Sequence, residues 1–208
     1  MEFAGEFETH LTVQLVAANG IDALRRWAEE RSLKCTHIVL ARGASASQPM
    51  LTREGKGTLS AELQTASRLA DELNVAGFRV TRVKIEASLW NKDIPATKGK
   101  AAAHPPERYF EHHFKLLLDA DADIARLTAL AQQHGAHVSR NALRLRDDGR
   151  QERFVTQRCH RVGRGAAAAR LEILLSELRS GGYEMIEVER EFVVYDNNLA
   201  LDRGWIEP

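Results

Sequence analysis

The chain has 208 residues, and its hydrophobic content of 44% is enough for a core in one mid-sized domain or two small ones. Its 29 Lys and Arg residues equal its 29 Asp and Glu residues, so no net positive charge favours non-specific binding to nucleic acid. The sequence has neither a basic segment followed by an apolar run at its start nor an apolar stretch of about 20 residues, so we expect a cytoplasmic protein without a membrane partner.

The first part of the chain shows the periods of strands and helices in turn. Apolar residues alternate with polar ones over residues 7–15, which is the two-residue period of a strand with one buried face. Helical periods follow over residues 21–28 and 63–73, with short apolar runs around His37 and Leu51 between them. The second helix ends near Gly77, and residues 79–87 form the last predicted strand.

The second part repeats this order after residues 91–108, a stretch rich in Pro, Ala and Lys. Strand alternation over residues 110–118 precedes helical periods over residues 124–131 and 171–178, and a last strand covers residues 184–195. Six short matches recur in the same order in both parts, such as Thr36-His37-Ile38 with Ala136-His137-Val138. Self-similarity in a fixed order indicates duplication.

The order strand, helix, strand, strand, helix, strand is that of a ferredoxin-like unit. We therefore predict an α+β fold built as a tandem duplication of a ferredoxin-like βαββαβ unit, with antiparallel sheets and helices on one face. The predicted boundaries are a first α+β repeat over residues 1–90, a linker over 91–108, and a second α+β repeat with a C-terminal tail over 109–208. The free faces of the two sheets either pack on each other or line a shared groove.

A Gly-basic-Gly turn is predicted to open the second helix of each repeat, as Gly55-Lys56-Gly57 and as Gly163-Arg164-Gly165. Unpaired amides and the dipole at a helix N-terminus favour an anion, and a basic side chain adds charge. The predicted phosphate-binding residues are Lys56, Arg164, Gly55, Gly57, Gly163 and Gly165. The alternative is that these glycines only permit a turn.

Charged side chains gather on the polar face of each predicted sheet. Glu8 and His10 share one side of the first strand, because alternate residues of a strand point the same way. The predicted catalytic residues are His10 and His113, as proton-transfer groups, with Glu8 and Glu111 to position them, and the predicted ligand-binding residues of this face are Lys115 and Arg158. The alternative is a solvated face on which cross-strand ion pairs contribute little.

His10 and Glu86 lie on the first and last strands of one repeat, and His113 and Glu191 lie on those of the other. Imidazole and carboxylate together suit a divalent metal. This placement resembles the vicinal oxygen chelate fold, in which two repeats each give ligands from these strands. The resemblance implies a metal held by His10, Glu86, His113 and Glu191, although units of that family have no second helix before the last strand.

Two further resemblances concern phosphate chemistry. Glu111-His112-His113-Phe114-Lys115 is similar to the opening strand of the triphosphate-tunnel enzymes, and Arg144-Leu145-Arg146 and Thr156-Gln157-Arg158 are similar to their basic strands. His10-Leu11-Thr12 and His137-Val138-Ser139 resemble the paired tripeptides of the two-histidine phosphoesterases, but they fall on different strands of their repeats. None of the three resemblances covers enough of the chain to identify a family.

We therefore predict binding of a small anionic, phosphate-containing ligand on the duplicated polar faces, with hydrolysis or transfer at a phosphoryl centre as the expected chemistry. Two alternatives stay open. One is a non-catalytic interaction module whose sheet faces mediate formation of a homodimer or docking to a larger protein, and the other is an enzyme with a divalent metal as cofactor. Whether the protein is an enzyme is left open by the sequence.

Overall fold

The computed structural model describes residues 2–15, 20–144 and 146–206. It has an α+β fold of two units with the same order of elements. The elements of the first unit are β1 (Ala4–Gln14), α1 (Gly20–Glu29), β2 (Lys34–Leu40), β3 (Ser47–Thr58), α2 (Leu59–Val75) and β4 (Arg79–Ser88). A short helix, α3 (Lys98–Ala102), lies between the units.

The second unit repeats the strand and helix order of the first. Its elements are β5 (Tyr109–Leu118), α4 (Ile124–Gln133), β6 (Ala136–Asn141), β7 (Gln151–His160), α5 (Arg164–Ser180) and β8 (Glu184–Asp196). The strands pair antiparallel in the order β4-β1-β3-β2 in one unit and β8-β5-β7-β6 in the other. Both are the ferredoxin-like order, so the predicted fold class is confirmed.

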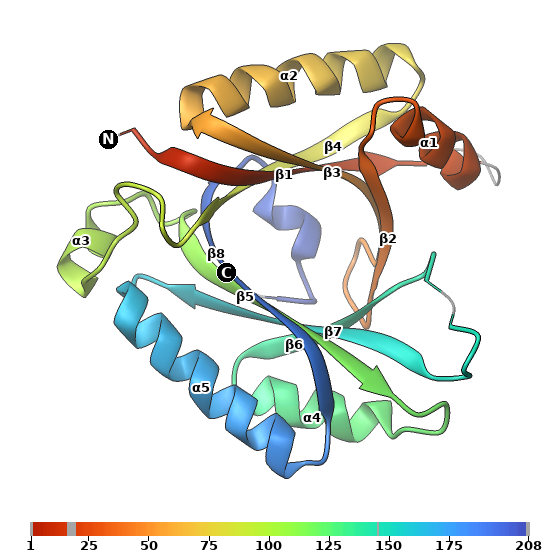
Figure 1. Ribbon diagram of the computed structural model, residues 1–208, viewed down its shortest axis with the longest axis vertical. Helices are drawn as coiled ribbons and strands as arrows, with labels where there is room; N and C mark the ends of the chain where they lie inside the picture. The colour runs from red at the N-terminus through yellow and green to blue at the C-terminus, as the bar shows by residue number, and fades with distance from the viewer. Residues whose placement is uncertain (1, 16–19, 145, 207–208) are drawn as a thin grey trace.

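The two sheets join at both edges and close into one barrel. β2 pairs with β6, and β4 pairs with β8, which gives the ring β1-β3-β2-β6-β7-β5-β8-β4. Figure 1 shows α1 and α2 on one outer side of this ring and α4 and α5 on the opposite side. The free faces of the sheets therefore line a shared interior.

The alternation predicted for the first strand decides which side chains enter that interior. Phe7, Leu11 and Val13 face outward into an apolar core that includes Leu73 of α2. Glu8, His10 and Thr12, at the intervening positions, line the interior cavity. Full burial of a large aliphatic side chain stabilises the fold by about 1.5–3 kcal/mol, so the outward apolar rows fix the register that turns the polar rows inward.

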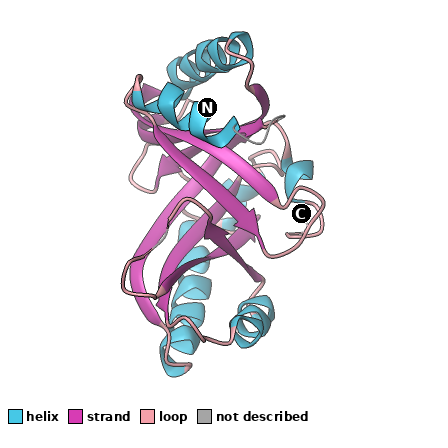
Figure 2. Ribbon diagram, turned by 90° about the vertical axis from the view of Figure 1, so that its right-hand side faces the viewer, coloured by secondary structure: helices cyan, strands magenta, loops and turns pink. Residues whose placement is uncertain are grey.

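The second unit has a core of its own between its sheet and its helices, whereas the core of the first unit extends to Phe110, Cys159 and Phe192 of the second. In the second unit Phe114 and Leu116 of β5 pack with Leu171 and Leu174 of α5. In Figure 2 the strands form one continuous layer in the middle of the molecule, with helices above and below. None of the helices in the described ranges combines the length and apolar character needed to cross a bilayer.

The chain returns to the barrel after β8. A short 3-10 helix, η1 (Leu199–Asp202), follows, and in Figure 1 this blue segment lies within the ring of strands. Trp205 and Ile206 are buried against Leu40 of β2. We call residues 197–206 the tail.

Candidate functional site

The barrel encloses a polar cavity of about 170 Å³, to which every strand contributes inward side chains. Two histidines occupy equivalent positions in it, one from each unit. Nδ1 of His10 lies 2.9 Å from the hydroxyl of Thr52, and Nδ1 of His113 lies 3.1 Å from the hydroxyl of Thr156. Each threonine stands opposite its histidine in the ladder of the first and third strands of its unit. His10 and His113 therefore occupy the same position in their units, and each forms the same hydrogen bond to a threonine of the third strand.

The second nitrogen of each histidine faces a buried carboxylate. Nε2 of His10 lies 2.6 Å from Oε2 of Glu86, and Nε2 of His113 lies 3.1 Å from Oε1 of Glu111. Glu86 Oε1 also lies 3.8 Å from His113 Nε2, so this carboxylate contacts the histidines of both units. Burial alone lowers the pKa of His113, but hydrogen bonds to Glu111 and Glu86 raise it to about 10. Without a further ligand His113 is therefore a cation at neutral pH.

Lys84 connects the two units at the centre of the cavity. Its ammonium lies 2.8 Å from Oε1 of Glu86 and 2.8 Å from Oε1 of Glu111. Burial would raise the pKa of Glu86, but Lys84 and His10 hold it well below its usual range. Burial would likewise raise the pKa of Glu111, which Arg158 and Lys84 keep well below its usual range. Both carboxylates are therefore ionised.

Glu191 differs from Glu86 and Glu111, because its surroundings favour the protonated carboxyl group. It makes no hydrogen bond or ion pair with the described part of the chain, although it lines the cavity. Burial and the nearby charge of Glu86 raise its pKa well above the usual value. Burial, together with Glu86 and Glu189, also raises the pKa of Glu8. This part of the interior therefore holds more carboxylates than its own cations neutralise.

Glu86, His113 and Glu191 come together as a potential metal site, which we call the Glu86 cluster. One ligand atom from each of the three lies within 4.8 Å of the others. These are three of the four residues predicted from the sequence as metal ligands, and the fourth, His10, contacts Glu86. Two carboxylate oxygens and one imidazole nitrogen form a donor set that suits a divalent transition metal.

A second hollow adjoins this cluster and is predominantly acidic. Its walls include both Glu8 and Glu191, which also line the interior cavity. The charged side chains around it are Glu6, Glu8, Glu54, Lys56, Glu189, Arg190 and Glu191. Five acids against two bases give a field that attracts cations toward the interior.

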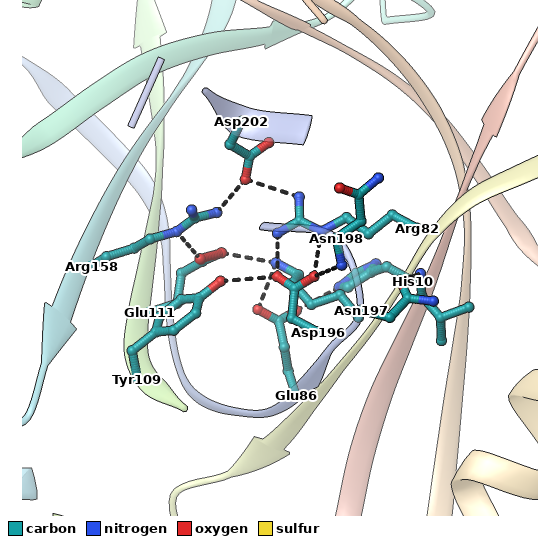
Figure 3. A network of polar contacts seen from close by, with 12 residues as sticks. His10, Arg82, Glu86, Tyr109, Glu111, Arg158, Asp196, Asn197, Asn198 and Asp202 are labelled. Atoms are coloured by element: carbon teal, nitrogen blue, oxygen red, sulfur yellow. Dashed lines mark hydrogen bonds and ion pairs between the residues drawn. The ribbon is translucent and has the colours of Figure 1, made fainter. Parts of the chain in front are cut away.

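A different region of the interior is dominated by arginines. Arg82 donates from NH1 to Oδ2 of Asp202 at 2.9 Å, and Arg158 donates from NH2 to the same oxygen at 2.6 Å. Asp196 holds the other side of the Arg82 guanidinium, and Glu111 accepts from Nε of Arg158 at 2.7 Å. Figure 3 shows these groups converging from β4, β5, β7, β8 and the tail. We call Arg82, Arg158, Asp196, Asp202 and Glu111 the arginine network.

The remaining ligand-binding residue predicted on the polar face, Lys115, also faces inward. It lines the cavity and forms an ion pair with Glu187 of β8. Arg158 faces inward as well, and two of its nitrogens, Nε and Nη2, bond to Glu111 and Asp202.

The Gly-basic-Gly prediction needs a correction. Gly55-Lys56-Gly57 lies inside β3 and forms no turn, because it continues the ladder with β1 as far as Thr58. Thr58 is the N-cap of α2, whereas Gly163 itself is the N-cap of α5, so the two tripeptides do not occupy equivalent positions.

The basic residues of these tripeptides lie outside the interior cavity. Lys56 is exposed and lies 3.7 Å from Glu6, and Arg164 donates to the carbonyl of Leu89 at 3.0 Å. Neither Gly55, Gly57, Gly163 nor Gly165 lines that cavity. Anion binding at these tripeptides stays a prediction.

The strand register also corrects the match between His37 and His137. Thr52 and Thr156 are equivalent positions of the two units, and His137 pairs with Thr156 whereas Lys34, not His37, pairs with Thr52. His137 lies outside the main cavity, with its ring 5.9 Å from that of Trp205. The tripeptides resembling those of the two-histidine phosphoesterases therefore do not face each other.

Sequence reasoning missed Arg82, Asp196 and Asp202. Arg82 shares a face with Lys84 and Glu86, because it lies two positions before Lys84 on one strand, so the two-residue period could have revealed it. Asp202 belongs to a segment without strand or helix period, and nothing in the sequence places it inside the barrel.

Comparisons with known proteins give no assignment. No protein-family model and no curated protein matches the chain. Among solved structures, the small subunit of acetolactate synthase from Thermotoga maritima is 13% identical with a TM-score of 0.32, and the match covers 91% of this chain and 94% of that one. A putative chlorite dismutase is 14% identical with a TM-score of 0.27, covering 95% of this chain and 97% of that one. Scores of this size carry no conclusion about function.

Proposed function

We propose that the barrel interior is a divalent-metal site with an adjoining cavity for a small ligand. The observation that carries this proposal is the Glu86 cluster, in which the ligand atoms of Glu86, His113 and Glu191 lie within 4.8 Å of one another. Glu191 has no partner among the described residues, and its raised pKa reflects burial beside Glu86. A bound cation would satisfy this carboxylate.

The charge around the cluster supports a cation rather than a free anion as the first ligand. The interior cations Lys84 and Arg158 already contact carboxylates, whereas Glu8 and Glu191 have raised pKa values. Metal binding would displace the proton of His113 and that of Glu191, because metal ligands bind in their deprotonated forms. The adjacent acidic hollow would concentrate cations on the approach to the cluster.

Three ligands from the protein would leave coordination positions of the metal free for a small molecule, as catalytic metal sites do. His10 would stand next to such a molecule, with Glu86 and Thr52 fixing its ring, and could move a proton. The anionic, phosphate-containing ligand predicted from the sequence fits this arrangement through the metal. Hydrolysis or transfer at a phosphoryl centre stays a prediction.

The test is a titration of the purified, chelator-treated protein with Mn²⁺, Co²⁺ and Zn²⁺ by isothermal calorimetry. We expect one site per chain, proton release on binding, and an affinity at least about 10-fold lower in Glu191→Gln, since a lost ligand costs no less than a lost supporting group. Glu189→Gln is the matched control: Glu189 lies on the same strand and lines the same cavity, but it is not part of the Glu86 cluster. Equal affinities in both variants would rule out this site.

The homodimer predicted from the sequence uses the sheet faces, which line the barrel interior, but one separate observation favours a homodimer through a strand edge. Residues 184–190 of β8 pair with β5 on one side only, because the pairing of β4 with β8 covers residues 191–196. The side chains of Ile186 and Val188 on this free edge are 43% and 36% exposed. An open strand edge with apolar side chains can add a strand from a second copy. Light scattering of the wild type and of Ile186→Lys would decide, since a dimer through this edge must dissociate in the variant.

A further inference from the structure

The position of Asp202 is unusual, because its carboxylate comes from the tail while the groups that hold it come from the barrel. Arg82 and Arg158 bind Oδ2, and the amide of Gln48 donates to Oδ1 at 3.0 Å. These three side chains lie on β4, β7 and β3, respectively. The side chain of Asp202 is only 1% exposed, so the carboxylate is sequestered and both of its oxygens are bonded.

The two arginines do not depend on Asp202 for their placement. Asp196 binds Nε and NH2 of Arg82 and leaves NH1 for Asp202. Glu111 binds Nε of Arg158 and leaves NH2 for Asp202. Both guanidinium groups would therefore stay in place without the tail carboxylate, and preorganised donors of this kind bind anions well.

The tail is held by side-chain and loop contacts. Asn197 and Val83 bond to each other twice, the side chain of Asn198 donates to the carbonyl of Thr81, and the amide of Ala44 donates to the carbonyl of Arg203. Its apolar anchor consists of Trp205 and Ile206 against Leu40 and Ile38, apart from the two main cores. The indole of Trp205 donates to the carbonyl of Val138 at 3.1 Å. Within the described part of the chain, residues 197–206 belong to no strand ladder. An element bonded this way can detach at a lower free-energy cost than the strands can separate.

We infer that Arg82, Arg158 and Gln48 form a binding site for a carboxylate or phosphate group, and that Asp202 occupies this site in place of an external ligand. The same cavity wall carries Arg82, Arg158 and Asp202 together with His113 and Glu191. A small molecule with its anionic group between the arginines therefore extends toward the Glu86 cluster, separated from it by Glu111. This inference rests on the proposed function for the role of the bound molecule. It adds that the small ligand of the metal site carries an anionic group at one end.

The test is chemical rescue of an Asp202→Ala variant, with acetate and inorganic phosphate as probes and with EDTA present to exclude metal. We expect the variant to melt at a lower temperature than the wild type and to regain about 5 to 10 °C in Tm once the probe exceeds its Kd about 100-fold. Acetate replaces the missing carboxylate directly, so a larger rise with acetate than with phosphate indicates a site shaped for a carboxylate, and the reverse a site for phosphate. Addition of Arg158→Gln to this variant should abolish the rescue.

The matched control is Asp148→Ala, which removes an aspartate held by two arginines, Arg146 and Arg150, at the surface. An equal rise in Tm for Asp148→Ala and Asp202→Ala would overturn the inference, because the probes would then act on any vacated arginine pair. A second readout uses a protein that keeps Asp202 and carries Trp27→Phe and Trp90→Phe, so that Trp205 is its only tryptophan. A probe that displaces Asp202 should shift the Trp205 emission to longer wavelength.

This second readout decides the matter if Asp202→Ala does not fold, and an unchanged emission at all probe concentrations would then overturn the inference. Metal plays no part in either experiment. A failed anion site with intact Mn²⁺ binding, or the reverse, therefore separates this inference from the proposed function.

Discussion

Two regions of the barrel interior differ in whether their carboxylates are paired with cations. In the arginine network, Asp196, Asp202 and Glu111 each contact at least one guanidinium group, and the pKa of Asp202 lies below its usual value despite burial, because of Arg82 and Arg158. At the Glu86 cluster, Glu191 forms no ion pair with any residue that the structure describes, and its pKa lies well above the usual value because of burial and the nearby Glu86. In the first region every carboxylate has a cationic partner, whereas in the second Glu191 has no ion-pair partner among the described residues.

Breaking the arginine network should have the largest effect on stability. Arg82→Ala would leave Asp196 and Asp202 buried without their shared cation, and the loss of one partner from a buried pair costs about 3–5 kcal/mol. We expect the free energy of unfolding to fall by this amount in urea titrations. Arg150→Ala, which removes an arginine from a surface ion pair, should change it by no more than about 1 kcal/mol. Similar losses of unfolding free energy in Arg82→Ala and Arg150→Ala would show that the buried arginine network contributes no more to stability than a surface ion pair.

Lowering the pH should reduce the stability of the fold around the tail, because His137 lies beside Trp205 and close to Arg158. Burial, with Arg42 and Arg158, lowers the pKa of His137 to about 4 from a usual value near 6.5. Because the unfolded chain then binds the proton more tightly, this contribution to stability is fully present above about pH 6.5 and is lost as pH falls toward 4.

The measurement is the free energy of unfolding at pH 7 and pH 5 for the wild type and His137→Asn. The variant should lose less stability between these values than the wild type. The groups that face His137 in the fold include Arg42, Arg158, His160 and Trp205, and none of them is acidic. An identical pH dependence in both proteins would show that His137 does not titrate in this way.

A substitution at the Glu86 cluster should act in the opposite direction, though more weakly. Glu191→Gln removes a half-buried carboxyl group beside Glu86 that has no partner among the described residues, so in EDTA we expect stability at pH 8 to rise by about 1 kcal/mol. The same variant loses metal affinity, as described above. Glu189→Gln should leave stability nearly unchanged. A destabilised Glu191→Gln would mean that the region needs no ligand.

Much of the fold could be predicted from the sequence because its strands alternate cleanly. The period of β1 placed His10 with Glu8, and the order of helices and strands gave the ferredoxin-like units. Closure of the two sheets into a barrel could not be read in this way, since the pairings of β2 with β6 and β4 with β8 depend on strand ends and register. The copying of one segment stays a proposal that the shared strand order supports.

The candidate site could be predicted only where it lies on regular strands. Glu86, His113 and Glu191 follow from the two-residue period once their strands are identified. The Gly55-Lys56-Gly57 prediction was wrong about the turn, because two glycines close together are typical of turns although β3 continues through them. Asp202 could not be placed, because its position depends on the path of the tail over the finished barrel.

The double junction between the sheets has a consequence for the covalent link between the units. The ring is held shut by the strand pairs β2·β6 and β4·β8, and neither requires residues 91–108 to be continuous. A protease that cuts there would leave two fragments, each with half of the cavity wall. They should copurify as one particle and separate only when both junctions open and the apolar core that includes Phe110 and Phe192 is exposed.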